Sequence, residues 1–268
     1  MSGSGSDQDQ TAKPRDEQSR DALDSVTIAA FDVDSRIFRT MWHSLIRPND
    51  VARSALSADY SRYLSPIRVF VALFSFQFAV AALFGAPIDF SFEAMMMGVP
   101  PDAGEAWLAT GTPQPLSARE IDPALMGLMG ALLWPITVVS SLPYLCMLKL
   151  YRPSVSWWGH VLLYLVPVNG SFLMMIGFLP LFPLFQDHAN ALFGLSTTLA
   201  LVLYFILAGR VLAGFYARSS LGVTMRVIGL IAMLPITLLI TMVMQMVAAF
   251  WLLNSEFGLS AAALFSLL

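Results

Sequence analysis

The chain has 268 residues, of which 57% are hydrophobic and only 12% are charged. Soluble domains carry about twice that share of charged residues, so a soluble globular enzyme is excluded and a membrane protein is expected. The 15 basic and 18 acidic residues give a net charge of −3, which becomes informative only when mapped along the chain. The single cysteine, Cys146, excludes an intrachain disulfide and a cysteine-based zinc cluster, and its apolar neighbours indicate a packing role.

Residues 1–25 are polar and rich in Ser, Gly, Asp and Gln. Such a composition cannot bury enough apolar surface to fold, so a disordered cytoplasmic tail is expected here. The segment also lacks the apolar run of a secretory signal peptide. The first membrane span is therefore expected to act as the targeting signal.

Residues 26–65 are predicted to form an amphipathic helical hairpin at the inner leaflet. Its first helix carries a polar stripe opposite an apolar face, namely Arg36, Thr40, His43 and Arg47 against Ile37, Phe38, Met41, Trp42 and Leu45. We expect Pro48 to end this helix and Asn49 or Asp50 to cap a second helix that continues to Tyr63. Two basic helices with Trp and Tyr suit a membrane surface. Packing of the hairpin on the protein itself is the open alternative.

Residues 66–253 contain five apolar segments near the length of about 20 residues that a membrane-spanning helix needs. These segments are Pro66–Ala86, Pro123–Leu148, Trp158–Phe185, Ala191–Leu207 and Val227–Leu253. Residues 254–268 form a short apolar C-terminal tail that cannot span and that either lies in the interface or packs on the bundle. The sequence thus predicts an all-α polytopic membrane bundle of about five transmembrane helices, preceded by the amphipathic hairpin.

The basic residues predict the orientation of this bundle. Fourteen of the 15 fall on one side of the five-span arrangement, and Arg119 falls on the other. Basic loops stay in the cytoplasm, so the N-terminus is expected inside and the C-terminus outside. A bacterial inner membrane is the expected location.

A short motif lies directly before the first span. It consists of Phe38-Arg39-Thr40, Arg47-Pro48, Arg62-Tyr63 and Pro66 with Arg68. This stretch resembles an uncharacterised family of bacterial integral membrane proteins, many of which begin with a cysteine zinc ribbon. The resemblance implies a membrane class and topology rather than a reaction. It also marks Arg39, Arg47, Arg62, Tyr63 and Arg68 as a candidate cytoplasmic-face motif.

The same family resemblance extends to a later block, where a basic segment precedes a histidine. Lys149, Arg152 and His160 match it in this chain. The zinc ribbon is absent, Ala58-Asp59 replaces the small-residue turn usual before the Arg-Tyr pair, and Val166 and Val168 stand where further histidines are expected. No metal site and no cofactor are therefore expected.

Five polar residues fall inside or at the ends of the predicted spans. His160 is read either as a functional group or as a hydrogen-bonded residue of an aromatic belt with Trp157 and Trp158. Three amides, Gln77, Asn169 and Gln245, either pair between helices or line a polar cavity. Arg210 is expected to extend towards the cytoplasm.

The outer loop, residues 87–122, holds the run Met95-Met96-Met97. Thioethers bind Cu(I), but consecutive residues of a helix point in different directions and no His or Cys joins them. A packing role is the favoured interpretation of this run.

The sequence carries no nucleophile elbow, zinc-protease or P-loop motif, and the five predicted spans contain no acidic residue. A non-enzymatic scaffold or accessory component is therefore predicted, contacting lipid, partner proteins or a second copy, and no nucleic acid. A small-solute transporter or permease subunit is the alternative, favoured by a polar cavity joining the three amides. A membrane-embedded lipid-acting enzyme is the second alternative, favoured by a pocket joining His160 to Arg39 or Arg62.

Overall fold

The computed structural model describes residues 35–84, 92–96, 101–110, 116–185, 188–217 and 219–265. Within these ranges the chain is helical and contains no strand, which confirms the predicted all-α class. Four helices there are long and apolar enough to cross a membrane. They are α7 (Ala118–Tyr151), α8 (Trp157–Phe178) with the 3-10 turn η1 (Leu179–Leu184), α9 (Ala189–Phe215) and α10 (Ser220–Phe257). The predicted tail, residues 1–25, lies outside the described residues.

These four helices stand where the four later spans were predicted, and α4 (Pro66–Phe84) stands at the place of the first. The apolar stretch of α4 found within the described residues, Pro66–Gln77, is shorter than the other four. Three of the long helices, α7, α9 and α10, run beyond the predicted apolar segments at both ends. For example, α10 has 38 residues because it continues through polar ends that apolarity alone does not mark.

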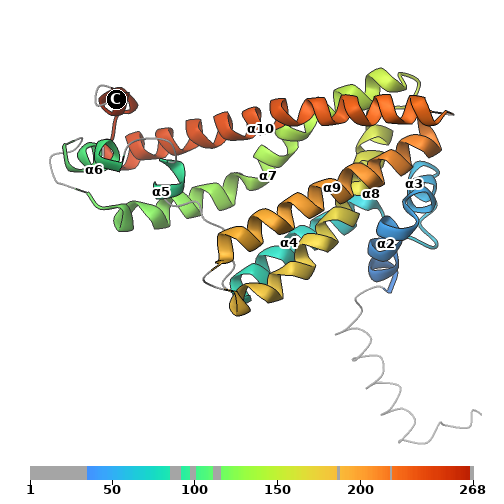
Figure 1. The fold of residues 1–268 in the computed structure, drawn as a ribbon, viewed down its shortest axis with the longest axis horizontal. Coiled ribbons are helices and arrows are strands. Elements are labelled where there is room, and N and C mark those ends of the chain that lie inside the picture. Colours follow the sequence, from blue (N-terminus) through green and yellow to red (C-terminus); the bar gives the residue numbers. More distant parts are fainter. Residues whose placement is uncertain are drawn as a thin grey trace, which may run out of the picture.

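The long helices form two arms (Figure 1). In one arm α8 packs against α4 and α9, and in the other α7 pairs with α10. The arms converge at the end that carries α2 (Ser35–Ile46) and α3 (Pro48–Leu56), here called the hairpin end, and diverge towards the other, far end (Figure 1). A buried core where they converge includes Leu148, Leu163, Leu212 and Leu230. Consecutive long helices run in alternating directions between the two ends.

Both helices of the hairpin pack on α8, and α3 also contacts α9. The hairpin therefore packs on the protein itself, as the open alternative predicted. Thr40 is fully buried. Its hydroxyl can be buried because it donates a hydrogen bond to the Arg36 carbonyl and accepts one from the Leu64 backbone N–H at 2.9 Å. The apolar side of α2 instead leaves Phe38 and Trp42 exposed by 61% and 54%. Burial of α2 is therefore divided between its two sides, since Ile37 and Met41 of the apolar side also pack against buried residues.

Two details of the predicted hairpin are wrong. The first helix does end before Pro48, at Ile46, but Pro48 itself occupies the first turn of α3 behind Arg47, and neither Asn49 nor Asp50 caps that helix. Proline suits this position because its missing N–H would be unpaired there anyway. The second helix ends at Leu56 rather than at Tyr63, in a left-handed turn at Ala58 (φ 53°).

A cluster of apolar side chains closes the far end of α7 and α10. Two short helices from the outer loop, α5 (Phe92–Met95) and α6 (Pro101–Thr110), pack there with α11 (Ala261–Phe265) of the C-terminal tail. Trp107 is fully buried in this cluster and its indole N–H donates to the Ser260 carbonyl at 3.1 Å. Met96 is buried there too, in a packing role, whereas Met97 lies outside the described residues. The tail thus packs on the protein.

Candidate functional site

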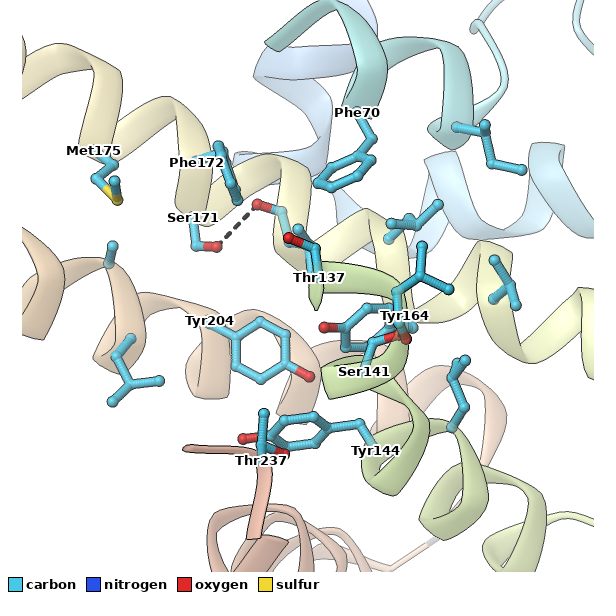
Figure 2. Close-up of a pocket in the computed structure, with 18 of the residues that line it drawn as sticks. Phe70, Thr137, Ser141, Tyr144, Tyr164, Ser171, Phe172, Met175, Tyr204 and Thr237 are labelled. Atoms are coloured by element: carbon cyan, nitrogen blue, oxygen red, sulfur yellow. Dashed lines mark hydrogen bonds between the residues drawn. The ribbon is translucent and has the colours of Figure 1, made fainter. Parts of the chain in front are cut away.

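A cleft of about 530 Å³ lies between the two arms (Figure 2). Its volume is within the usual range for sites that bind small molecules. Side chains from α4, α7, α8, α9 and α10 line it, and none of the 22 lining residues is charged. Its polar groups are hydroxyls and two tryptophan N–H groups. The cleft therefore suits an apolar or neutral occupant rather than an ion.

Three tyrosines form the polar centre of the cleft, each from a different helix. Tyr144 of α7 stacks on Tyr164 of α8 with ring centroids 6.1 Å apart. Tyr204 of α9 meets both rings edge-on, at 5.9 and 6.2 Å. In Figure 2 the three rings lie together, with Thr237 of α10 beside Tyr144. Each of the helices α7, α8, α9 and α10 thus contributes one hydroxyl to the centre of the cleft.

Three of the smaller hydroxyls of the cleft, those of Thr137, Ser141 and Ser171, are already engaged as donors. Ser141 donates to the Val138 carbonyl at 2.7 Å, and Ser171 donates to the Val168 carbonyl at 2.9 Å (Figure 2). Thr137 donates in the same way within α7. By contrast, the Thr237 hydroxyl is buried without a hydrogen-bond partner among the described residues, and the hydroxyls of Tyr164 and Tyr204 make no hydrogen bond to any described residue. They are donors directed to the cleft.

An aromatic wall lies on the α4 side of the same cleft. Phe70 packs edge-on against Trp134 at 5.4 Å and against Phe172 at 5.8 Å. Phe74 lies close to Trp134 as well, with centroids 4.4 Å apart. Flat aromatic rings offer a large, rigid apolar surface. The wall and the tyrosines together enclose a space suited to a flat apolar group.

His160 is placed outside this cleft, in the core where the arms converge. It is fully buried, and its Nδ1 atom lies 2.7 Å from the Tyr216 hydroxyl. Burial raises the pKa of Tyr216, and nearby Arg152 opposes that change. Because both partners are closed off from solvent, the pair ties the end of α9 to the start of α8. Neither Arg39 nor Arg62 is in hydrogen-bond contact with His160 within the described chain.

The three amides that the sequence singled out are not brought together. Asn169 is fully buried and donates to the Pro66 carbonyl at 2.9 Å, which joins α8 to the first turn of α4. Gln77 lies far along α4, and Gln245 lies on α10 towards the far end. None of them lines the cleft. Asn169 therefore has the interhelical role and the predicted polar cavity is not formed by this set.

Arg210 contacts the hairpin rather than open solvent alone. Its guanidinium donates to the carbonyls of Ile46 at 2.9 Å and Leu45 at 3.5 Å, at the last turn of α2. The last carbonyls of a helix lack partners within the helix and attract positive charge. Arg210 therefore stabilises the end of α2 against α9.

The cytoplasmic-face motif divides between packed and exposed residues. Tyr63 is buried, its hydroxyl lies 2.7 Å from the Nδ1 atom of His43, and Arg62 lies over its ring at 5.3 Å. Arg39, Arg47 and Arg68 are exposed. The motif thus surrounds the join between the hairpin and α4 and forms no enclosed pocket.

The tyrosine cluster was not predicted from the sequence. The available signal was the depth of Tyr144, Tyr164 and Tyr204 within three different apolar segments. That signal becomes specific only when the helix pairing is known.

Comparison with known proteins adds one match. Residues 34–78 match a family described as "Protein of unknown function (DUF3667)". The matched residues cover α2, α3 and the first part of α4, the region in which the resemblance to an uncharacterised family was found. The chain matches no curated protein and no solved structure.

Proposed function

We propose that this chain is a non-enzymatic integral membrane component that holds a lipid in the cleft between its two arms. The observation that carries the proposal is the cleft itself, about 530 Å³ in volume and lined by uncharged, mainly apolar side chains. Inside a bilayer, such a cleft is surrounded by lipid chains. An apolar chain that enters it gains close packing against the aromatic wall.

The two alternative functions lack a supporting arrangement among the described residues. A small-solute transporter needs a polar path, whereas the amides Gln77, Asn169 and Gln245 stand apart. A lipid-acting enzyme needs a reactive group at the cleft, whereas His160 is buried against Tyr216. The proposal therefore keeps the scaffold or accessory role.

The proposal places the hairpin end in the cytoplasm and the far end outside, in a bacterial inner membrane. Its support is the charge pattern. The hairpin, the α7–α8 connection and the α9–α10 connection lie at the same end (Figure 1) and, together with the adjoining helix ends, carry most of the basic residues. Arg119 lies at the opposite end, at the start of α7.

Contacts with a partner protein or with a second copy belong to the same proposal. The outer face of α10 exposes large apolar side chains, including Leu239, Met242, Val247 and Trp251. In a membrane such a face is covered by lipid or by another protein.

The proposal is tested by filling the cleft. Thr197 lines the cleft from α9 and is itself exposed, so Thr197→Trp places an indole in the cleft without overpacking the core. We expect native mass spectrometry of the purified protein to show at least a fivefold drop in co-purified lipid. The expected cause is steric exclusion of the lipid chain.

Thr198→Trp is the matched control, because Thr198 is also exposed on α9 but does not line the cleft. It should retain lipid as the unmodified protein does. Equal lipid retention by the two variants would contradict the proposal. Their thermal unfolding midpoints should agree, which excludes a folding defect as the cause.

A further inference from the structure

The cleft contains a hydrogen-bonding pattern that restricts what can occupy its centre. The Tyr164 and Tyr204 hydroxyls are available donors, whereas Ser141 and Ser171 already donate to carbonyls of their own helices. A donor that faces apolar surroundings without a partner costs free energy. The occupant is therefore expected to bring hydrogen-bond acceptors to the tyrosines.

The charge of the occupant is restricted as well. None of the cleft residues is charged, and an isolated ion in an apolar environment is strongly unfavourable. Phosphate and carboxylate headgroups are excluded from the centre for this reason. An uncharged acceptor such as a carbonyl oxygen is compatible with it.

The depth of the tyrosines separates them from the headgroup region. Tyr164 lies seven residues into α8, and Tyr144 lies seven residues before the end of α7. At 1.5 Å per residue, each is about 10 Å from the hairpin end of its helix. Trp157 and Trp158 at the start of α8 are exposed by 53% and 62%, as is typical of residues at a membrane interface. An acceptor that reaches the tyrosines must therefore lie within the hydrocarbon, below the ester groups of a phospholipid.

The shape of the cleft favours a flat group at this depth. Phe70, Trp134 and Phe172 form the aromatic wall, and the tyrosine rings lie across the cleft from it (Figure 2). The remaining surface is mainly aliphatic, interrupted by Ser and Thr hydroxyls, and extends along α8 from Trp158 to Met175. That length, about 25 Å along the helix, can accept an apolar tail.

We propose that the cleft binds a neutral lipid that carries carbonyl oxygens on a flat ring, the chemical class of the isoprenoid quinones. The ring lies between the aromatic wall and the tyrosines, and its carbonyl oxygens accept hydrogen bonds from Tyr164 and Tyr204. The tail follows the aliphatic part of the cleft. This inference rests on the proposed lipid-holding function and adds the ligand class.

The test compares two probes on the full chain in lipid nanodiscs. One is a benzoquinone with a ten-carbon tail, and the other is an alkylbenzene with the same tail and no carbonyl groups. We expect the quinone to bind at least tenfold more tightly. Tyr164→Phe and Tyr204→Phe keep the rings and remove the donors, so each should weaken quinone binding about fivefold and leave alkylbenzene binding unchanged.

Tyr60→Phe is the control, because Tyr60 lies in the connection before α4 and outside the cleft. It should not change the binding of either probe. If both probes bind equally well, or if the two cleft variants leave quinone binding unchanged, the ligand class is wrong while the lipid-holding function stands. If neither probe binds and a charged phospholipid does not bind either, both proposals are wrong.

Discussion

His43 lies on α2 with its Nδ1 atom 2.7 Å from the Tyr63 hydroxyl, and its environment disfavours the protonated imidazolium. Burial is the largest cause that lowers its pKa below the ordinary value of 6.5, followed by the positive charges of Arg47 and Arg62. The folded protein therefore holds His43 neutral at a pH where an unfolded chain binds a proton.

This lowered pKa predicts that the hairpin is less stable in acid. Above about pH 6.5 the histidine is neutral in both states and stability is not affected. As the pH falls below that value, the unfolded state gains the proton first, so stability is lost. After correction for the pH dependence of intrinsic amide exchange, the α2 amides should be less protected from hydrogen exchange at about pH 5.5 than at about pH 7.5.

His43→Gln is neutral at every pH and keeps a polar side chain near Tyr63. The acid-dependent loss of protection of the α2 amides should therefore be smaller in this variant than in the unmodified chain. An equal loss in both proteins would assign the effect to another group.

Residue identity predicted some of these roles and not others. A buried amide such as Asn169 is expected to pair, and its N–H group does so with the Pro66 carbonyl, whereas its Oδ1 atom has no hydrogen-bond partner among the described residues. Its partner could not be predicted, because a backbone carbonyl leaves no mark in the sequence. The tyrosine cluster was missed for a related reason, since Tyr144, Tyr164 and Tyr204 meet only after α7, α8 and α9 pack.

At the scale of elements, the contact of α2 with α8 depends on a glycine. A methyl group on Gly170 would lie 3.0 Å from the carbonyl oxygen of Ser44 on α2. The Ser44 backbone belongs to a helix and cannot yield locally. The close approach of α2 to α8 thus depends on the absence of a side chain at Gly170.

Gly170→Ala is therefore expected to push α2 away from α8 and to lower the free energy of unfolding by about 1–3 kcal/mol. Thermal or denaturant unfolding in detergent measures the change. Gly177 lies on the same helix with nothing within 4 Å of an added methyl group. Gly177→Ala should be neutral or slightly stabilising, because alanine favours helix more than glycine does. A loss of equal size in both variants would contradict the role given to Gly170.

Periodicity and apolar length predicted the helices well, and their ends less well. The polar ends of α10 continue the helix because Ser219 caps one end through Gly222 and Gly258 closes the other in a left-handed conformation (φ 70°). Which face of α2 is buried could not be read from its pattern. That face follows from the Thr40 hydroxyl pairing with a backbone N–H of the following connection.

At the scale of the whole molecule, the alternating helices and the basic residues at the hairpin end predict a fixed orientation. In a background with Cys146→Ser, a cysteine at Thr110 should react with a membrane-impermeant thiol reagent added to intact cells. A cysteine at Ser219 should react only after the membrane is opened. The reverse pattern would contradict the positive-inside orientation.

The helices α7 and α10 have 34 and 38 residues, which correspond to lengths of about 51 and 57 Å. Even at a tilt of about 40°, each covers roughly 40 Å along the membrane normal, whereas the hydrocarbon core is about 30 Å thick. Each helix must therefore extend beyond the hydrocarbon at one end or at both. Such a projecting feature gives single-particle images of this 29.3 kDa chain a landmark outside the detergent belt and offers an epitope for antibody fragments.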